Sequence, residues 1–206
     1  MSGQYPFRDT IFALSSGGLP SGVAVIRLSG PHVRDVLQEV AGRVPPARQA
    51  TLMHLWDGDG RPLDHGLVLF FPSPASFSGE DCAEFHIHGG RAVVAALLGR
   101  LGALPGLRQA EAGEFTRRAF LNGKIDLTGA EGLADLIAAE TEAQRRMALD
   151  NAEGGQRVLY STWRKRLLHA RAMIEAELDF ADEADVPGSV SDLVWADLRD
   201  LGVEID

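Results

Sequence analysis

The chain has 206 residues, of which 45% are hydrophobic and 24% charged, a composition typical of a globular protein. Its formal net charge of -9 excludes the broad basic surface of many nucleic-acid-binding proteins, although a local basic patch at Arg117, Arg118 and Lys124 is compatible with it. The single cysteine, Cys82, excludes an intrachain disulfide and a cysteine-based zinc site. No apolar run approaches membrane-spanning length, and the N-terminus lacks the pattern of a signal peptide. We therefore expect a cytoplasmic protein with no membrane partner.

The first half of the chain predicts an α+β domain, a mixed sheet with helices. Runs of apolar and alternating residues predict six strands, over residues 10–14, 23–28, 51–56, 63–71, 82–88 and 107–110. Helical spacing of apolar residues predicts one helix that follows Ser29-Gly30-Pro31 and ends at Gly42, and another after Gly89-Gly90. The glycine-rich connector at 15–22 lacks the Gly-Lys-Ser/Thr of a phosphate-binding loop, so we expect no GTP binding by these residues.

Beyond residue 110 the chain predicts mainly helices. The first is expected over 113–121, with Phe115, Ala119 and Phe120 as its apolar face, and an Asn-Gly turn ends it. The second is expected to begin with Thr128 as its N-cap and Glu131 completing a capping box. An apolar stripe at 159–178, an acidic break at 180–188 and a last stripe at 194–205 follow. Because such stripes need packing partners, we expect this half to be less stable than the first or to depend on another chain.

Three charged residues lie at positions that suggest a binding site. Arg27 shares a strand face with Val23 and Val25, where an unpaired charge is costly. Glu84 lies on the polar face of its strand, and Lys124 follows the turn between two helices. Two cations and one anion suit a planar heterocycle that has a polar edge and a carboxylate tail. For Lys124 taken alone, a solvated loop lysine is the simpler interpretation.

Other reactive side chains suggest neither a catalytic nor a metal site. His86 and His88 share one strand face, but no spacing supplies a third metal ligand, so we expect histidines that face a groove. Glu80 and Asp81 are expected to cap or tether a loop rather than to act as an acid/base pair. Cys82 shows no sign of activation and is expected to be an inert thiol.

Three segments of the chain also carry a family resemblance. They are DTIFALSSGGLPSGVAVIRLSGP at 9–31, FSGEDCAEFHIHGG at 77–90 and AGEFTRRAFLNGKIDLTGAEGLADLIAAE at 112–140. In this order and spacing they resemble the signature blocks of the bacterial tRNA modification GTPase MnmE (TrmE) family, and the last block is highly specific. The resemblance implies a folate-binding and dimerisation domain of aminomethyltransferase-like fold over 1–120, followed by the first half of a helical domain over 121–206.

The resemblance also implies roles for the three charged residues. In the family, an arginine, a glutamate and a lysine of these blocks hold 5-formyl-tetrahydrofolate, and they match Arg27, Glu84 and Lys124. A reduced pterin presents a ring N–H beside an amino group, which match the two oxygens of a carboxylate, so Glu84 is assigned to the pterin edge. Whether Arg27 and Lys124 meet carbonyl oxygens or the glutamate tail of the folate is left open. Further implied partners are a second copy of the chain, bound through the N-terminal domain, the flavin-dependent protein MnmG and tRNA.

The same resemblance implies that a GTPase domain lies beyond Asp206, with its GTP, magnesium and potassium sites, together with a second helical half and a C-terminal cysteine motif. We therefore expect this chain to be the N-terminal part of a GTPase that, with MnmG, modifies the wobble uridine of tRNA. One alternative is an independent folate-dependent aminomethyltransferase, which would turn over a one-carbon donor alone. Another is a purely structural dimerisation module, in which the three charged residues are salt-bridge partners.

Overall fold

The structure, a computed structural model of the chain, describes residues 7–179 and 191–205. The chain forms two compact units that divide between Asp126 and Leu127, and each is described by itself. The boundary expected after residue 120 falls inside helix α3 (Glu114–Leu121). The turn after α3 belongs to the first unit, because Asn122 and Lys124 both donate hydrogen bonds to main-chain oxygens of that unit.

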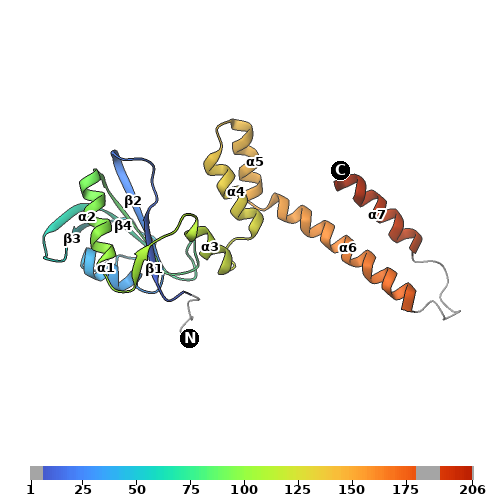
Figure 1. Ribbon diagram of the computed structural model, residues 1–206, viewed down its shortest axis with the longest axis horizontal. Helices are drawn as coiled ribbons and strands as arrows, with labels where there is room; N and C mark the ends of the chain where they lie inside the picture. Colours follow the sequence, from blue (N-terminus) through green and yellow to red (C-terminus); the bar gives the residue numbers. More distant parts are fainter. Residues whose placement is uncertain (1–6, 180–190, 206) are drawn as a thin grey trace. The chain divides into compact units, whose positions relative to one another are not determined.

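The first unit is built on one six-stranded mixed sheet, shown in Figure 1. Its strands, in the order in which they lie side by side, are β3 (Thr51–Trp56), β4 (Pro62–Phe71), β5 (Cys82–Gly89), β2 (Ser21–Ser29), β1 (Thr10–Leu14) and β6 (Leu107–Gln109). All neighbours are antiparallel except β1 and β6, which are parallel. The predicted α+β class and all six predicted strands are confirmed.

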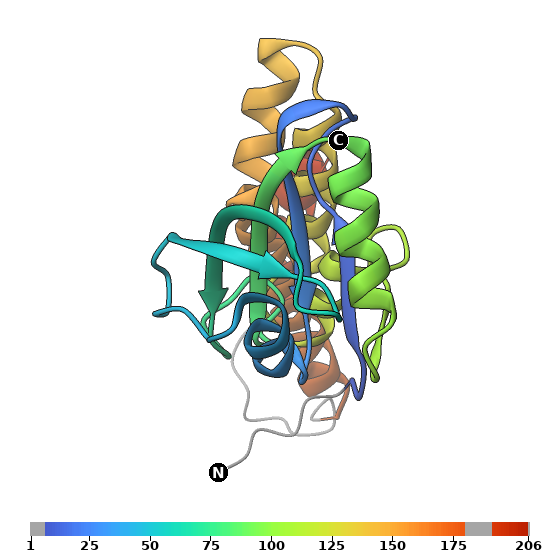
Figure 2. The same cartoon turned by 90° about the vertical axis from the view of Figure 1, so that its left-hand side faces the viewer.

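Two helices, α1 (Val33–Ala41) and α2 (Arg91–Gly102), pack on one face of this sheet (Figure 2). Their apolar sides and every second strand residue form the core, which includes Ile26, Phe85 and Leu97. Gly42 ends α1 with a φ of 77°, a left-handed conformation that glycine adopts without a steric penalty. Both helices therefore follow the apolar spacing from which they were predicted.

The opposite face of the sheet carries the residues that alternate with the core. Val23, Leu52 and Leu67 are exposed there. Leu52 and Leu67 lie directly opposite each other on β3 and β4, and Leu67 is next to His86 of β5. Arg27 and Glu84 belong to this same face, because strand neighbours such as Ile26 and Phe85 point into the core. The candidate site thus lies on the face that α1 and α2 leave open.

The second unit consists of four helices in its described part (Figure 1), namely α4 (Leu127–Ala138), α5 (Glu142–Ala152), α6 (Gly155–Asp179) and α7 (Ser191–Ile205). Thr141 caps α5 through a complete capping box with Gln144. Gly132 lets α4 approach α5 closely, since a Cβ at this position would lie 2.5 Å from the main-chain nitrogen of Ala152. The predicted all-helical segment is confirmed.

Two details of the second unit differ from the sequence-based expectation. Thr128 is not the N-cap of its helix, because α4 already begins at Leu127. Ile137, whose helical spacing with Leu133 and Ala134 predicts a shared apolar face, is exposed. Ala170, Val194 and Leu201 of the two long stripes are buried, and Arg166 links α6 to Asp197 of α7 at 2.7 Å. The acidic break expected at 180–188 lies outside the described residues.

None of the helices that the structure describes is both long enough and apolar enough to cross a lipid bilayer.

Candidate functional site

The structure pairs two of the three predicted site residues directly. Arg27 of β2 and Glu84 of β5 are cross-strand partners in the antiparallel register. The guanidinium donates from Nε at 3.0 Å and from Nη2 at 2.8 Å, both to Oε1 of Glu84. Both side chains are partly buried, with 32% and 18% of their surface exposed. The charge predicted to need a partner has therefore found one across the strand pair.

His86 completes this arrangement on the same face of β5. Its Nε2 lies 3.2 Å from Oε2 of Glu84, the oxygen that Arg27 does not contact. The next histidine along the face, His88, binds a different carboxylate, Asp64, with its Nδ1 2.8 Å from Oδ1. Each histidine thus has a carboxylate partner. Among the described residues, no group of three or more His, Cys, Asp or Glu side chains is arranged to hold a metal ion.

Two aromatic rings come close to the Arg27 guanidinium. Its central carbon lies 5.7 Å from the centre of the Phe77 ring and 5.8 Å from that of Phe115. Both distances are in the range of cation–π attraction, which holds a guanidinium beside an aromatic face. Phe77 comes from the loop between β4 and β5, and Phe115 from α3. Strand alternation alone did not indicate this aromatic pair, because neither ring belongs to the sheet.

Lys124, the third predicted site residue, lies on the rim formed by the β4–β5 loop. Its ammonium donates to the main-chain oxygen of Pro74 at 2.9 Å. Its aliphatic stem lies over Gly79, where an added Cβ would be 3.1 Å from Cγ of Lys124. Within residues 7–179 the structure shows no hydrogen bond or ion pair between Lys124 and either Arg27 or Glu84. The lysine is joined to the site through the loop that carries Phe77.

The buried face of α3 is charged, which corrects the sequence-based expectation. Ala119 is buried as expected, but the other two buried residues of this helix are Glu114 and Arg118, and Phe120 is 44% exposed. The proposed basic patch is wrong for Arg118, which is fully buried. Apolar periodicity does not predict a buried charged residue, because it assigns every charged residue to the surface. The available signal was the four-residue spacing of Glu114 and Arg118 on one helical face.

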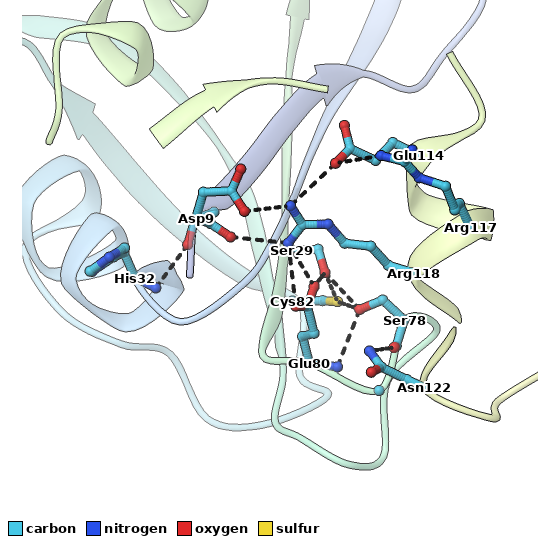
Figure 3. Close-up of polar contacts among 12 residues, drawn as sticks. Asp9, Ser29, His32, Ser78, Glu80, Cys82, Glu114, Arg117, Arg118 and Asn122 are labelled. Carbon is cyan, nitrogen blue, oxygen red and sulfur yellow. Dashed lines mark hydrogen bonds and ion pairs between the residues drawn. The ribbon is translucent and has the colours of Figure 1, made fainter. Parts of the chain in front are cut away.

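Arg118 binds three carboxylates from three separate segments (Figure 3). Its Nη2 donates to Oδ1 of Asp9 at 2.9 Å and to Oε1 of Glu114 at 3.3 Å. Its Nη1 donates to both oxygens of Glu80 at 3.3 Å and to the main-chain oxygen of Asp9 at 3.0 Å. Arg118 thereby joins α3, the β4–β5 loop and the residue before β1. Glu80 tethers its loop as predicted, through a partner that the sequence did not identify.

The two glutamates of this cluster have opposite pKa shifts. Burial raises the pKa of Glu80, and the hydrogen bond from Ser29 and the charge of Arg118 offset part of that rise. Hydrogen bonds from Arg108 lower the pKa of Glu114 from 4.5 to about 2, against the effect of burial. The two pKa shifts differ in direction because Glu114 accepts shorter hydrogen bonds from a guanidinium than Glu80 does. Glu114 accepts from Arg108 at 2.5 and 2.8 Å and from the Glu111 amide at 2.9 Å, whereas the guanidinium on Glu80 is 3.3 Å away.

A second set of polar groups closes the base of the β4–β5 loop. Ser29 Oγ lies 2.5 Å from Oε2 of Glu80 and 2.6 Å from Oγ of Ser78. Cys82 is buried beside them, with its Sγ 3.1 Å from the Ser78 hydroxyl. The side-chain amide of Asn122 donates to the main-chain oxygen of Ser78 at 2.7 Å (Figure 3). The loop with Phe77 and the helix with Phe115 are therefore fixed to each other on either side of Arg118.

Two family models match the chain. Residues 10–124 match the model described as GTP-binding protein TrmE N-terminus, and residues 127–206 match the MnmE helical domain. A relative from Chelativorans sp. (strain BNC1), named tRNA modification GTPase MnmE, is 65% identical over 205 residues, which cover 100% of this chain and 46% of the relative. A relative of the same name from Brucella anthropi is 66% identical over 199 residues, 97% of this chain and 45% of the relative. The chain spans less than half the length of these relatives.

Replacing Arg118 by Met should destabilise the first unit by about 3–5 kcal/mol, because Glu80 would be left buried without its cation. Urea unfolding measured by circular dichroism gives this change. The control is Arg117→Met in the same helix, whose guanidinium is 55% exposed and whose loss should cost within about 0.5 kcal/mol. Equal losses in the two variants would contradict a special role of the buried arginine. Adding Glu80→Gln to Arg118→Met should recover part of the lost stability.

The lowered pKa of Glu114 predicts a pH-dependent contribution to stability. A carboxylate whose pKa is depressed on folding stabilises the protein above its ordinary pKa of 4.5, and this contribution disappears as the pH falls toward about 2. We expect Glu114→Gln to be less stable than the wild type by on the order of 2 kcal/mol at pH 7, after allowance for the partly exposed Arg108. Urea titrations between pH 7 and pH 2 should show the difference shrinking below pH 4.5. A difference that stays constant over this range would disprove the assignment.

Proposed function

We propose that the first unit of this chain binds 5-formyl-tetrahydrofolate or a related tetrahydrofolate. The chain belongs to the family of the tRNA modification GTPase MnmE (TrmE). The residues proposed to bind the folate are Arg27, Glu84 and Lys124. The observation that carries the proposal is the pairing of Arg27 with Glu84 on the open sheet face, with Phe77 and Phe115 beside the guanidinium.

The chemistry of this group suits a reduced pterin. A carboxylate with two oxygens accepts two parallel N–H donors, and the pyrimidine edge of a pterin supplies a ring N–H and an amino group. Aromatic rings favour a flat, polar ring system by stacking against its face. Lys124, on the rim, adds a second positive charge for carbonyl oxygens or for the glutamate tail.

The whole protein's activity is a further part of the proposal. We propose that the chain acts within a longer GTP-binding protein that modifies the wobble uridine of tRNA in the cytoplasm together with the flavin-dependent protein MnmG. In that setting the bound folate supplies or positions a one-carbon unit. The names of the two relatives, tRNA modification GTPase MnmE, support this assignment. The GTP, magnesium and potassium sites are not assigned to residues of this chain.

One observation favours a second candidate function, a purely structural module. Arg27 and Glu84 form a salt bridge with each other, as expected if their role were only to stabilise the strand pair. A partly exposed ion pair contributes little to stability, typically below about 1 kcal/mol, so a structural role alone gives a weak reason for this arrangement. Calorimetry with 5-formyl-tetrahydrofolate separates the two functions, because a structural module would release no heat of binding.

Glu84→Gln should weaken the binding of 5-formyl-tetrahydrofolate by about tenfold or more, because one acceptor oxygen becomes a donor that faces donors. Lys124→Ala should weaken it less, because the lysine is exposed and already bound to a main-chain oxygen. Isothermal titration calorimetry measures both effects. Glu39→Gln, on the helix-covered side of the sheet, is the matched control and should leave the affinity unchanged. An unchanged affinity of Glu84→Gln would refute the assignment.

We also propose that the chain forms a homodimer through its first unit. The open sheet face exposes Val23, Leu52 and Leu67, and exposed apolar side chains grouped on one face favour association. Sedimentation at micromolar concentration should therefore give the mass of a dimer, and Leu52→Lys should shift it toward the monomer. Val203→Lys, at an exposed position of α7, should not. A monomer mass for the wild-type chain would contradict the proposal.

A further inference from the structure

The contact between Arg27 and Glu84 has an unusual distribution of donors. Both guanidinium donors, Nε and Nη2, point to the same oxygen, Oε1, at 3.0 and 2.8 Å. The other oxygen, Oε2, has His86 Nε2 as its neighbour at 3.2 Å. A carboxylate oxygen accepts about two hydrogen bonds, so Oε1 is already saturated by Arg27.

A pterin edge would need the oxygen that Arg27 already uses. Its ring N–H and its amino group are parallel donors that pair with the two oxygens of one carboxylate, one donor for each. The guanidinium offers Glu84 the same kind of donor pair, two N–H groups attached to one carbon. The ring edge and Arg27 are therefore rivals for Oε1.

We infer that Arg27 is a specificity-determining residue that competes with the ring of the ligand for Glu84, and this inference rests on the proposed function. When the ring edge binds Glu84, the guanidinium leaves Oε1, and the negative carboxylate tail of the same ligand becomes its electrostatic partner. A folate supplies this replacement partner, whereas a pterin without a tail does not. Because of this competition, the site prefers folates over simple pterins. The preference comes from the carboxylate tail of the folate, which lies away from the ring.

The surroundings of Arg27 allow such an exchange. About one third of its side chain is exposed, and Phe77 and Phe115 hold the guanidinium through ring contacts rather than through further hydrogen bonds. In contrast, Arg118 is completely buried among three carboxylates and cannot turn without breaking the cluster that fixes α3. The Phe77 loop and α3 are held by Arg118 and Asn122, so Arg27 can move while the rings stay in place.

The test compares two ligands on three proteins. The full chain, Arg27→Met and Arg117→Met are titrated with 5-formyl-tetrahydrofolate and with 6-methyl-tetrahydropterin, which has the ring but no carboxylate tail. Methionine keeps an aliphatic stem beside the two rings and removes the donors. We expect Arg27→Met to bind the tailless pterin roughly tenfold more tightly than the wild type, because a charge-assisted rival is gone. The same variant should bind the folate no more tightly than the wild type, so its preference for folate falls.

Arg117→Met is the matched control for the loss of a guanidinium. The partners of Arg117 are Glu111 and Glu114, so its removal frees no oxygen of Glu84 and should leave the affinity for the tailless pterin unchanged. Circular dichroism confirms that each variant is folded. If Arg27→Met weakens the binding of both ligands, or if its affinity for the pterin does not rise, the inference is overturned and the proposed folate site stands. If the wild-type chain binds neither ligand, the proposed function falls together with the inference.

Discussion

The buried guanidinium of Arg118 is the contact on which the geometry of the candidate site depends. It holds α3 against the residue before β1 through Asp9 and against the β4–β5 loop through Glu80, and it also pairs with Glu114 of α3 itself. These are the segments that bring Phe115 and Phe77 to Arg27. An apolar contact is not directional, whereas a guanidinium that pairs with carboxylates from other segments has a defined orientation. The cost of burying these charges is offset by their mutual pairing, with only Nε of Arg118 left without a partner.

The sheet provides the second constraint, through its register. Arg27 and Glu84 meet because β2 and β5 pair with these two residues directly opposite each other. A shift of the register by one residue would turn one of the two side chains into the core beneath α1 and α2. The apolar residues that alternate with them, such as Ile26 and Phe85, prevent that shift because they are completely buried. The hydrophobic core thus fixes the positions of the charged pair on the opposite face.

The parts of this structure that the sequence predicts are those governed by local periodicity. Alternation along β5 correctly separated Glu84 and His86 from Phe85, and the apolar spacing located α1 and α2. The sequence did not predict the charged buried face of α3, because Arg118 is buried only when Asp9 and Glu80, 109 and 38 residues away in sequence, come together around it. The aromatic pair beside Arg27 depends on the same long-range assembly. The strand alternation therefore placed Arg27 and Glu84 correctly but did not predict the aromatic rings beside them.

The hydrogen bonds of Lys124 determine which positions of the β4–β5 loop can change without loss of this contact. Both Lys124 and Asn122 bind main-chain oxygens of that loop rather than side chains. A main-chain oxygen is present whichever amino acid occupies the position, so these two hydrogen bonds do not depend on the chemistry of a loop side chain. Gly79 is different, because it has a φ of 81°, which disfavours other residues, and because an added Cβ would lie 3.1 Å from Lys124 Cγ and 3.2 Å from Asn122 Cβ. Natural variation in the loop should therefore be suppressed at Gly79.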